Sequence, residues 1–475
     1  MIRVTTFDGQ RVAVFGLARS GLSTAHALKA GGARVIAWDD KAEARETARD
    51  QGFAIEDFRV ADWSQIAALV IAPGVPLTHP EPHWTVKLAR AANVPVIGDV
   101  ELFFRERAKV APEAPVIAIT GTNGKSTTTA LTAHLFRQAG VDVAMGGNIG
   151  VGVLSLPPPA QNRVHVLELS SYQIDLTPSL KPTMGILLNI SPDHLDRHGT
   201  MENYAAVKAR LVEAADRAII GIDDEWCEEI ANRLRMMERS WVDLVSVKDR
   251  ASNGWYVAGE TFLNSRAPWA GIFGGFADLA LSPSLRGLHN AQNALSASCA
   301  AFIFGLSQDQ VREGLRTFGG LAHRMEIVGR AGKVLFVNDS KATNADSTEK
   351  ALAAYPRDIF WILGGEAKAG GIEPLAELFP RVKQAFLVGK ASDTFAETLG
   401  ATVPHVKCGT IDVALAAAAE AAAQRAQEPD CTEAVVLLSP ACASFDQFKS
   451  FEHRGDHFRT LVVARPGVVR PQQES

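Results

Sequence analysis

The segment Gly121-Thr122-Asn123-Gly124-Lys125-Ser126-Thr127 constrains this chain more than any other feature. It follows a strand-like apolar run, Pro115–Ile119, and precedes a helix-like stretch. In such a turn, backbone N–H groups and the start of the helix surround phosphate oxygens, while Lys125 reaches the outer phosphates and the Ser126 hydroxyl meets Mg²⁺. Ile119 stands where the longer form of this loop has a glycine, so the spacing is a shortened G-x-x-G-K-S. We predict that a nucleoside triphosphate is the energy source.

The size and charge of the chain narrow its class. Its 475 residues are too many for one core, so about three domains are predicted. A formal net charge of −5 argues against a nucleic-acid partner. The five cysteines are odd in number and form no C-x-x-C pair, which argues against a disulfide framework or a structural zinc and favours a reducing compartment. The sequence shows no signal core and no run of about 18 apolar residues, so we expect a cytoplasmic protein outside the membrane.

Strand-like runs alternate with Ala-rich helical stretches along most of the chain. This pattern is typical of parallel α/β layers that bind ligands at the carboxyl ends of their strands. We divide the chain into residues 1–110, 111–320 and 321–475. The charged segment 105–113, which contains a proline, is interpreted as a linker, and the Ala-rich stretch Ala414–Ala426 as a surface helix.

The first unit carries another glycine turn. Gly16-Leu17-Ala18-Arg19-Ser20-Gly21 follows a strand and opens a helix, and Asp39 ends the next strand about twenty residues later. This arrangement is typical of a dinucleotide or nucleotide-sugar site, with pyrophosphate at the helix start and the acid on a ring or ribose donor. The middle glycine of the dehydrogenase fingerprint is absent, so a purely structural turn stays open. We expect the loop Ala72–Pro76 to form a wall of the same pocket.

The second unit places polar side chains directly after two strands. Glu168 ends one apolar run, and the segment Asn189–His198 ends another. We interpret Glu168 as the acidic partner of Ser126 on Mg²⁺ and His194 as a neutral ligand or an orienting group. The Asp-His-x-Asp run in this segment could instead belong to a metal hydrolase, although no further cluster completes a two-metal site. By periodicity alone, Lys208 reads as an ordinary surface lysine.

Polar groups also gather at the boundary between the second and third units and after the strands of the third unit. Asn290 and Asn293 offer amides that can read a purine edge, and Arg324 is a cation that could reach the phosphates. Three loops rich in hydroxyls and lysines each follow a strand: residues 338–344, 364–368 and 438–448. Because Lys, Ser and Thr are suitable donors to carboxylate oxygens, these loops predict a pocket for a small dicarboxylate or a similar anion.

Taken together, these residues resemble the Mur ligases of bacterial cell-wall synthesis over all three units. The motifs that carry the resemblance are Gly121–Thr127, Glu168–Ser171, Asp193–Arg197, His323-Arg324, Asn338–Asn344 and Ser439–Gln447. Sister ligases share the first four, whereas the last two resemble the branch that adds D-glutamate. The resemblance implies three domains: an N-terminal Rossmann-like nucleotide-sugar domain, a central P-loop ATPase-type α/β domain and a C-terminal Rossmann-like domain.

The implied activity is an ATP-dependent amide ligation in cytoplasmic peptidoglycan precursor synthesis. The carboxylate of UDP-MurNAc-L-alanine would take the γ-phosphoryl group of ATP to give an acyl phosphate, and the amine of D-glutamate would then displace phosphate. The resemblance further implies a monomer that uses Mg²⁺ and small-molecule substrates, with no nucleic acid and no membrane.

The resemblance also assigns roles to individual residues. Catalysis would use Lys125, Glu168, His194 and Lys208. Two Mg²⁺ ions would be held by Ser126, Glu168, His194 and Lys208, the last of these carbamylated by CO₂. ATP would meet Gly121, Thr122, Asn123, Gly124, Lys125, Ser126, Thr127, Asn290, Asn293, Arg324 and Asp339. The UDP-substrate would meet Arg19, Ser20, Asp39, Lys41, Pro73, Gly74, Asn148 and His194. D-Glutamate would meet Lys341, Thr343, Lys368, Ser444, Phe445 and Phe451.

Two positions depart from the family pattern, and other functions explain less of the chain. Lys41 stands where an arginine against uracil is expected, and Phe445 stands where leucine is usual. Lysine cannot stack as a guanidinium does, which weakens the uridine assignment. A nucleotide-sugar dehydrogenase would explain only the first unit, and a P-loop kinase or ATPase switch only the second. A non-catalytic scaffold would leave the phosphate-binding residues unexplained. The nearest alternative is another Mur-type or folylpolyglutamate-type amino-acid ligase, although the latter lacks a separate uridine-binding domain.

Overall fold

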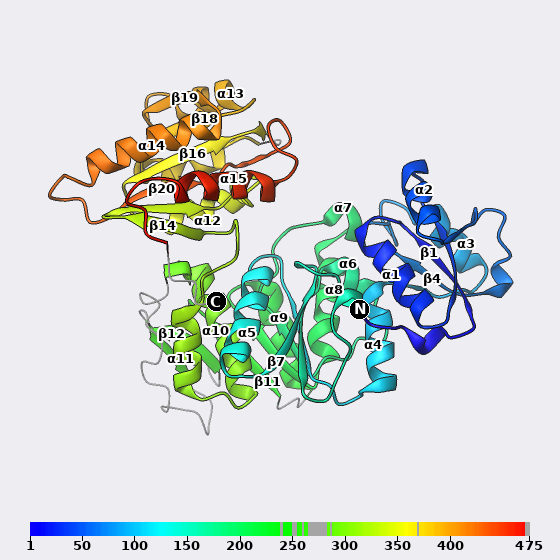
Figure 1. Ribbon diagram of the computed structural model, residues 1–475. Helices are drawn as coiled ribbons and strands as arrows, with labels where there is room; N and C mark the ends of the chain where they lie inside the picture. The colour runs from blue at the N-terminus through cyan, green and yellow to red at the C-terminus, as the bar shows by residue number, and fades with distance from the viewer. Residues whose placement is uncertain are drawn as a thin grey trace. The chain divides into compact units, whose positions relative to one another are not determined.

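The computed structural model describes residues 1–237, 241–248, 254–258, 261–264, 283–285, 287–367 and 370–470. Contacts divide the chain into a first unit, residues 1–278 with 292–315, and a second unit, residues 279–291 with 316–475. The first unit holds two large sheets and the second holds one (Figure 1). The predicted mixed α/β class is therefore confirmed. The boundary near residue 110 stays a prediction, because contacts join the first two sheets in one unit.

The first sheet is parallel throughout, with the strand order β3-β2-β1-β4-β5. Its strands are β1 (Arg11–Phe15), β2 (Arg34–Trp38), β3 (Ala54–Ile55), β4 (Ile66–Ile71) and β5 (Val96–Ile97). Its helices are α1 (Arg19–Ala30), α2 (Ala42–Asp50), α3 (Trp84–Ala91) and α4 (Asp99–Val110). Phe15 pairs with Trp38 on one side and with Ile71 on the other. The loops after β1, β2 and β4 therefore start at the same edge, where an open α/β sheet binds its ligand.

The second sheet has the order β13-β12-β11-β10-β9-β6-β8-β7, and only the β12–β13 pair is antiparallel. Its strands are β6 (Val116–Thr120), β7 (Asp142–Gly147), β8 (Arg163–Glu168), β9 (Met184–Leu187), β10 (Arg217–Gly221), β11 (Val242–Ser246), β12 (Gly254–Ala258) and β13 (Thr261–Asn264). Its helices are α5 (Lys125–Gln138), α6 (Ser171–Asp175), α7 (Leu195–His198), α8 (Met201–Glu213), α9 (Glu225–Met236), α10 (Leu288–Ile303) and α11 (Gln308–Thr317). Strand β6 is fully buried, and Ile119 pairs with Glu168, so the phosphate loop and Glu168 leave the same edge.

The interpretation of residues 105–113 as a linker is wrong for most of that segment. Residues 105–110 belong to α4, and their charged side chains are engaged. The Arg105 Nε donates to Glu101 Oε1 (2.6 Å), and the Arg107 Nε donates to the carbonyl of Ala114 (2.7 Å). Glu106 accepts from the backbone N–H of Thr5 (2.7 Å). A charged segment resembles a solvated linker in the sequence, but here the charged side chains have partners that only the tertiary structure brings near.

The second unit is built on a sheet of order β14-β15-β20-β16-β18-β19, parallel apart from the β14–β15 pair. Its strands are β14 (Glu326–Ala331), β15 (Val334–Asn338), β16 (Ile359–Gly364), β18 (Val382–Val388), β19 (His405–Gly409) and β20 (Ala434–Leu438), with a small β17 (Glu366–Ala367) and β21 (Cys442–Ala443) pair. Its helices are α12 (Ala345–Ala353), α13 (Ser392–Leu399), α14 (Ile411–Arg425) and α15 (Phe451–Val463). The neighbours β15, β20 and β16 end at one edge, since Leu438 pairs with Asn338 and Ile362.

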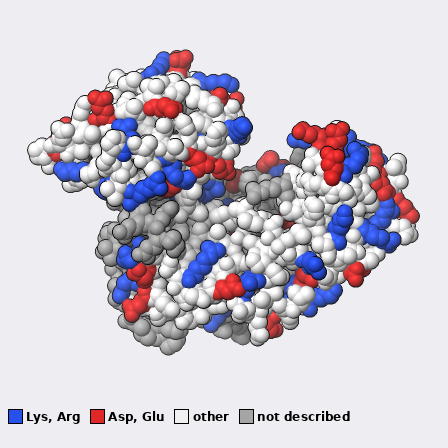
Figure 2. Space-filling view, viewed as in Figure 1, with Lys and Arg blue, Asp and Glu red and all other residues white. Residues whose placement is uncertain are grey.

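The Ala-rich stretch forms α14, but it is not simply a surface helix. Ala414, Ala418 and Ala422 are buried in the core cluster that covers one face of β16, β18 and β20 (Figure 1). Small side chains let the helix approach the sheet closely, which composition alone did not reveal. None of the described helices is long and apolar enough to cross a membrane. On the face shown in Figure 2, the described Lys and Arg side chains are interspersed with Asp and Glu rather than gathered in one basic field.

Candidate active site

The phosphate loop joins β6 to α5 in the predicted strand–turn–helix arrangement. Gly124 is the N-cap of α5 and has a φ of +82°, a conformation that glycine adopts without strain. Lys125 folds back over the loop, and its Nζ donates to the carbonyls of Gly121 (2.9 Å) and Thr122 (2.7 Å). Ser126 and Thr127 follow in the buried first turn. The loop therefore directs backbone N–H groups, an ammonium and a hydroxyl to one place, as phosphate binding requires.

A side chain that was given no role in the prediction holds this loop in shape. Asn189, directly after β9, accepts from the Asn123 N–H through Oδ1 (2.9 Å), and its carbonyl accepts from the Thr122 N–H (2.8 Å). The Thr122 hydroxyl lies 3.1 Å from the hydroxyl of Tyr204 on α8. At the start of the helix, the Thr128 hydroxyl donates to Asn293 Oδ1 (3.1 Å). Asn293, which was predicted to contact ATP, thus also holds the first turn of α5 through Thr128.

Glu168 presents a carboxylate oxygen that fits a cation. Its Oε1 accepts from the Asn148 side-chain amide (2.8 Å), whereas its Oε2 is buried without a hydrogen-bond partner. A buried carboxylate oxygen without a donor is costly, and a bound cation would remove that cost. The described residues contain no group of three or more His, Cys, Asp or Glu side chains that could form a metal cage. Such a sparse donor set suits Mg²⁺, which keeps several waters and binds substrate phosphates.

Lys208 is buried, so the periodicity-based prediction of a surface position is wrong. Its side chain is 1% exposed, and its Nζ donates to the Gly121 carbonyl (2.8 Å) and the Thr120 hydroxyl (3.2 Å). Burial lowers the pKa of Lys208 well below its usual value, and the neighbouring Lys125 ammonium lowers it further. The structure thus places an amine with a depressed pKa against the first residue of the phosphate loop.

The segment after β9 distributes its side chains in different directions. His194 adopts a positive φ of 53° and is the N-cap of α7, with a side chain 47% exposed. Its ring lies 5.0 Å from that of Tyr172, and its Nε2 is 3.3 Å from Asp193 Oδ2. His198 points the other way into the protein, where its Nε2 is 2.9 Å from the Ser171 hydroxyl and burial lowers its pKa to about 4. The exposed His194 is therefore the histidine that can meet a ligand.

In the first sheet, Asp39 fixes the glycine turn after β1. The Leu17 N–H donates to Asp39 Oδ2 (2.6 Å), and the Lys41 N–H donates to Asp39 Oδ1 (2.9 Å). A Cβ on Gly21 would lie 1.8 Å from the Gly16 carbonyl oxygen, so only glycine allows this helix to approach the strand so closely. The carboxylate predicted to meet a ribose or a ring donor already binds two backbone amides, although each oxygen keeps a lone pair for a ligand.

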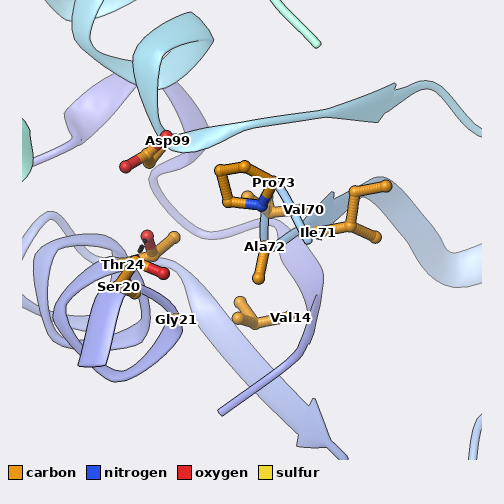
Figure 3. A pocket seen from close by; sticks show the side chains of 9 residues that line it. All are labelled: Val14, Ser20, Gly21, Thr24, Val70, Ile71, Ala72, Pro73 and Asp99. Atoms are coloured by element: carbon orange, nitrogen blue, oxygen red, sulfur yellow. Dashed lines mark hydrogen bonds between the residues drawn. The ribbon is translucent and has the colours of Figure 1, made fainter. Parts of the chain in front are cut away.

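The start of α1 and the loop after β4 line one small pocket (Figure 3). Ser20, Gly21 and Pro73 belong to it, while Gly74 lies directly beyond Pro73. Asp99, which was not predicted, completes the polar side of the pocket at the start of α4. Burial raises the pKa of Asp99 to about 6, although it accepts hydrogen bonds from the Val100 N–H and from Gln173. The side chain of Arg19 lies outside the described part of the structure.

An arginine does lie beside the position where one was expected against uracil. Lys41 is exposed, but Arg45, one turn into α2, stacks its guanidinium over the Trp38 ring at 4.5 Å. The Arg45 Nη1 also donates to the carbonyls of Asp39 (2.6 Å) and Asp40 (2.9 Å). Arg45 therefore shapes the loop after β2, and the guanidinium that Lys41 cannot provide is nearby.

In the second unit, Arg324 sits on a turn with unusual backbone geometry. Its neighbours His323 and Met325 both have positive φ values, 63° and 48°, which non-glycine residues seldom adopt. Asp339 holds the turn, because its Oδ1 accepts from the Met325 N–H (3.2 Å) and its Oδ2 accepts from the Ser439 hydroxyl (2.8 Å). Burial raises the pKa of Asp339 to about 7. Asp339 thus orients the predicted phosphate-binding arginine.

The three loops predicted to bind a dicarboxylate leave neighbouring strands, β15, β16 and β20. Arg454 of α15, which was not predicted, ties two of them together through the carbonyls of Ser340 (2.8 Å) and Cys442 (3.0 Å). Lys341 lies 5.6 Å from the centre of the Phe451 ring, and Phe445 is 70% exposed. Thr343 is half-buried and Ser444 is buried. Lys368 lies outside the described residues.

Two family models match the chain: the Mur ligase middle domain over residues 119–301 and the Mur ligase glutamate ligase domain over residues 323–442. The chain is 58% identical to a UDP-N-acetylmuramoylalanine–D-glutamate ligase of Nitrobacter hamburgensis, over 99% of each chain. It is 55% identical to the enzyme of that name from Brucella suis, over 100% of each chain. The chain belongs to the Mur ligase family. It is therefore a ligase of peptidoglycan precursor synthesis, and ATP and Mg²⁺ are consistent with its family.

Solved structures show that this Mur ligase has the fold of its family. The chain aligns with UDP-N-acetylmuramate–alanine ligase MurC from Thermotoga maritima with a TM-score of 0.55 at 14% identity, covering 94% of this chain and 98% of that one. It aligns with UDP-N-acetylmuramoyl-L-alanyl-D-glutamate–2,6-diaminopimelate ligase with a TM-score of 0.54 at 19% identity, covering 92% and 88%. At such low identity the likeness supports the architecture only.

Several residues that shape the site of this Mur ligase have no direct signal in the sequence. Asn189 and Arg454 act through contacts to backbone groups far away in the sequence, and Asp99 lines a pocket with residues of α1 and of the loop after β4. Asn189 lies within a segment that the strand-end rule had singled out, so its position was a usable signal. A buried acid at a helix start and a buried arginine in a C-terminal helix carry no pattern that distinguishes them from caps or surface charges.

Proposed function

We propose that this Mur ligase joins D-glutamate to UDP-MurNAc-L-alanine with the cleavage of ATP, as the names of its full-length relatives state for those enzymes. The observation that carries the proposal is the set of groups around the phosphate loop. Lys125 and the buried Lys208 both donate to the Gly121 carbonyl, and the Glu168 carboxylate ends the neighbouring strand. This set provides cations and an acid where a triphosphate would transfer its terminal group.

The proposed reaction has two steps that conserve atoms and charge. A carboxylate oxygen of UDP-MurNAc-L-alanine attacks the γ-phosphorus of ATP, and the bond from that phosphorus to the β-phosphate oxygen breaks. ADP departs, and the substrate becomes an acyl phosphate. The neutral amine of D-glutamate then attacks the acyl carbon, and the tetrahedral intermediate expels inorganic phosphate while the nitrogen loses a proton. Lys125 would balance charge on the phosphoryl oxygens, and correct alignment of the reactants can lower the barrier by roughly 7–11 kcal/mol.

The residues around the loop fit a divalent cation, which would polarise the γ-phosphoryl oxygens when bound. We propose that Ser126 and Glu168 hold one Mg²⁺ and that His194 helps to hold a second. Carbamylated Lys208 would supply a further carboxylate. The unpartnered Oε2 of Glu168 supports the first assignment. The exposed ring of His194 supports the second.

Carbamylation of Lys208 is supported by its burial. CO₂ reacts only with a neutral amine: the nitrogen forms a bond to carbon, one proton leaves, and a carbamate anion results. Burial lowers the pKa of Lys208 and so favours the neutral amine. The anion formed would lie close to the Lys125 ammonium, which would stabilise it. The modification therefore replaces a neutral amine with an anion that the Lys125 ammonium attracts.

The remaining assignments extend the proposal to the three substrates. ATP would contact the phosphate loop, Asn290, Asn293, Arg324 and Asp339. The UDP-substrate would contact Arg19, Ser20, Asp39, Lys41, Pro73, Gly74, Asn148 and His194. D-Glutamate would contact Lys341, Thr343, Lys368, Ser444, Phe445 and Phe451. We also propose that the enzyme acts in the cytoplasm, which its five free cysteines support.

A direct assay tests this function. Purified protein is given UDP-MurNAc-L-alanine, ATP and Mg²⁺ with either D- or L-glutamate, and the product is identified by mass. We expect ligation with D-glutamate, together with phosphate release that requires both the nucleotide-linked acid and the amino acid. Phosphate release without those two substrates would indicate an ATPase or a kinase. Ligation of another amino acid, or of a folate, would indicate a different ligase.

The carbamate has a test of its own. We expect Lys208→Ala and Lys208→Arg to lose most turnover, and short-chain carboxylic acids to restore part of it in Lys208→Ala by occupying the vacated space. Lys87→Ala is the matched control, because Lys87 lies on α3, beside the first sheet, and pairs with Glu81. Normal turnover of Lys208→Ala at low bicarbonate would contradict the carbamate. So would a defect that no carboxylic acid rescues, if Lys208→Arg behaved like the wild type.

A further inference from the structure

Arg197, on the short helix after His194, contacts the first sheet. Its Nη1 donates to the carbonyl of Gly74 (2.9 Å), and its Nη2 donates to the carbonyl of Val75 (2.9 Å). These two carbonyls are consecutive and belong to the loop after β4, which lies more than a hundred residues away in the sequence. The guanidinium therefore grips this loop with two parallel hydrogen bonds, a geometry that its planar fork provides.

An aromatic ring also holds the Arg197 side chain in place. Its guanidinium lies 4.6 Å from the centre of the Tyr172 ring on α6, the same ring that lies 5.0 Å from His194. Its Nε is buried without a hydrogen-bond partner. The guanidinium is thus held between the Tyr172 ring and the loop carbonyls, although leaving the Nε unpaired is costly.

A second contact joins the same two segments. Gly199 follows α7, and a Cβ there would lie 2.7 Å from the ring of His79 in the loop after β4. Loop residues Gly74, Val75 and His79 thus all meet the segment that runs from His194 to Gly199. Because α7 spans only Leu195–His198, a displacement of the loop would be transmitted to His194 over a single helical turn.

We infer that Arg197 is a positioning residue that sets the loop Pro73–Val75 at a fixed distance from His194. The inference rests on the proposed function, in which Pro73 and Gly74 contact the nucleotide-linked acid and His194 lies beside its reacting carboxylate. Arg197 itself contacts none of the three substrates. It holds the pocket wall in the first sheet and the phosphate site in the second sheet in register, so that one long substrate can reach both.

The inference makes a specific kinetic prediction. Removing the fork should weaken the binding of the substrate that spans both sites, while the ATP site, built from the phosphate loop, keeps its contacts. We expect Arg197→Met to raise the KM for UDP-MurNAc-L-alanine about tenfold or more, and to leave the Kd of an ATP analogue within about twofold. Arg197→Lys keeps the charge over the Tyr172 ring but cannot donate to two consecutive carbonyls. Its KM for UDP-MurNAc-L-alanine should therefore fall between those of the wild type and Arg197→Met.

The test uses the whole enzyme and a matched control. Arg163→Met is suitable, because Arg163 also donates to a backbone carbonyl (Pro158, 2.9 Å) and pairs with Asp142, but it lies at the amino end of β8. Each variant is compared with the wild type in KM for all three substrates, kcat, melting temperature, and hydrogen exchange of residues 72–80. We expect faster exchange in that loop in Arg197→Met and no change of KM in Arg163→Met.

The outcomes separate this inference from the proposed function. If the wild type ligates D-glutamate but Arg197→Met and Arg197→Lys keep a normal KM for UDP-MurNAc-L-alanine, the positioning role is wrong and the function stands. If the KM values for all three substrates rise together and the melting temperature falls, Arg197 is only structural and the inference is overturned. If the wild type gives no ligation, the proposed function itself fails, and the loop exchange rates still report whether Arg197 holds the loop.

Discussion

The two glycine turns of the first unit look alike in sequence but are used differently. Each joins a buried parallel strand to a helix, and each contains a glycine that no other residue can replace without a clash. Among the described side chains, a carboxylate holds the turn after β1: Asp39 accepts from the Leu17 N–H, and Asp99 lies at the pocket beside the turn. At the turn after β6, the Lys125 ammonium and the amine of Lys208 both donate to the Gly121 carbonyl.

The contrast between these turns suggests that one backbone shape can serve two kinds of phosphate site. A turn supported by carboxyls offers backbone N–H groups and hydrogen-bond acceptors, which suits a pyrophosphate that is bound but not broken and hydroxyl groups on a sugar. A turn supported by cations suits a phosphoryl group that gains negative charge as it is transferred. We therefore propose that the charges around each turn, rather than the glycines, decide whether it binds a substrate or takes part in the reaction.

The largest expected effect tests the catalytic role of the second turn. Lys125→Ala should lower kcat about 10²–10³-fold, because the positive charge nearest the transferring phosphoryl group is lost. Phosphate release and product mass measure the change. Lys29→Ala is the control, since Lys29 lies in the last turn of α1 and donates to the Gly52 carbonyl. Unchanged ligation by Lys125→Ala would show that the two turns do not differ as described.

A second comparison exchanges the glycines themselves. In Gly21→Ala the new Cβ would meet a backbone oxygen at 1.8 Å, which cannot move away without displacing the strand, so we expect a loss of about 3–4 kcal/mol in the free energy of unfolding. In Gly124→Ala the new Cβ would meet the side-chain Oδ1 of Asn293 at 2.2 Å, and the amide can shift. There we expect a loss of about 1–2 kcal/mol from the positive φ. Urea denaturation of both variants measures the difference, and equal losses would contradict it.

The carboxyl beside the first turn predicts a pH effect on stability. Burial raises the pKa of Asp99 to about 6 from 3.8, so the folded protein keeps a proton that the unfolded chain releases. As the pH rises from 4 to 6, the wild type should therefore lose about 2 kcal/mol of stability relative to Asp99→Asn, out of about 3 kcal/mol over the whole titration, with little further change above pH 7. Urea denaturation of both proteins from pH 4 to pH 8 measures this. A constant difference across the range would show that Asp99 is not perturbed.

The smallest effect concerns recognition at the first turn. Arg45→Met should raise the KM for UDP-MurNAc-L-alanine about three- to tenfold, because the loop after β2 loses its stacking on Trp38 and its hydrogen bonds to two carbonyls. Turnover at saturating substrate should stay close to that of the wild type. Arg49→Met is the matched control, because Arg49 is exposed on the same helix. A normal KM in Arg45→Met would show that Arg45 does not replace the arginine that the family pattern has at the position of Lys41.

The sequence predicted local elements well, because their signals lie within a few residues. The strand before the phosphate loop, the glycine turns and the polar loops after β15, β16 and β20 follow from apolar runs and turn residues next to one another. The errors fell where the partner was distant in sequence. Residues 105–110 formed a helix rather than a linker, and the Ala-rich stretch packed on a sheet, because contacts from other segments decided both.

The sequence by itself determined which groups the phosphate loop of this Mur ligase carries: two glycines, a lysine and a hydroxyl in one turn. It also placed an acid at the end of a later strand, β8. Only the tertiary structure decided the burial, the hydrogen-bond partners and the pKa of the groups around that turn. It buried Lys208 and left one Glu168 oxygen without a partner, and it turned Arg197 toward the first sheet. The reason is physical. Hydrogen-bond geometry in a turn is local, whereas the pKa of an amine and the exposure of a carboxylate depend on every segment that excludes water from them.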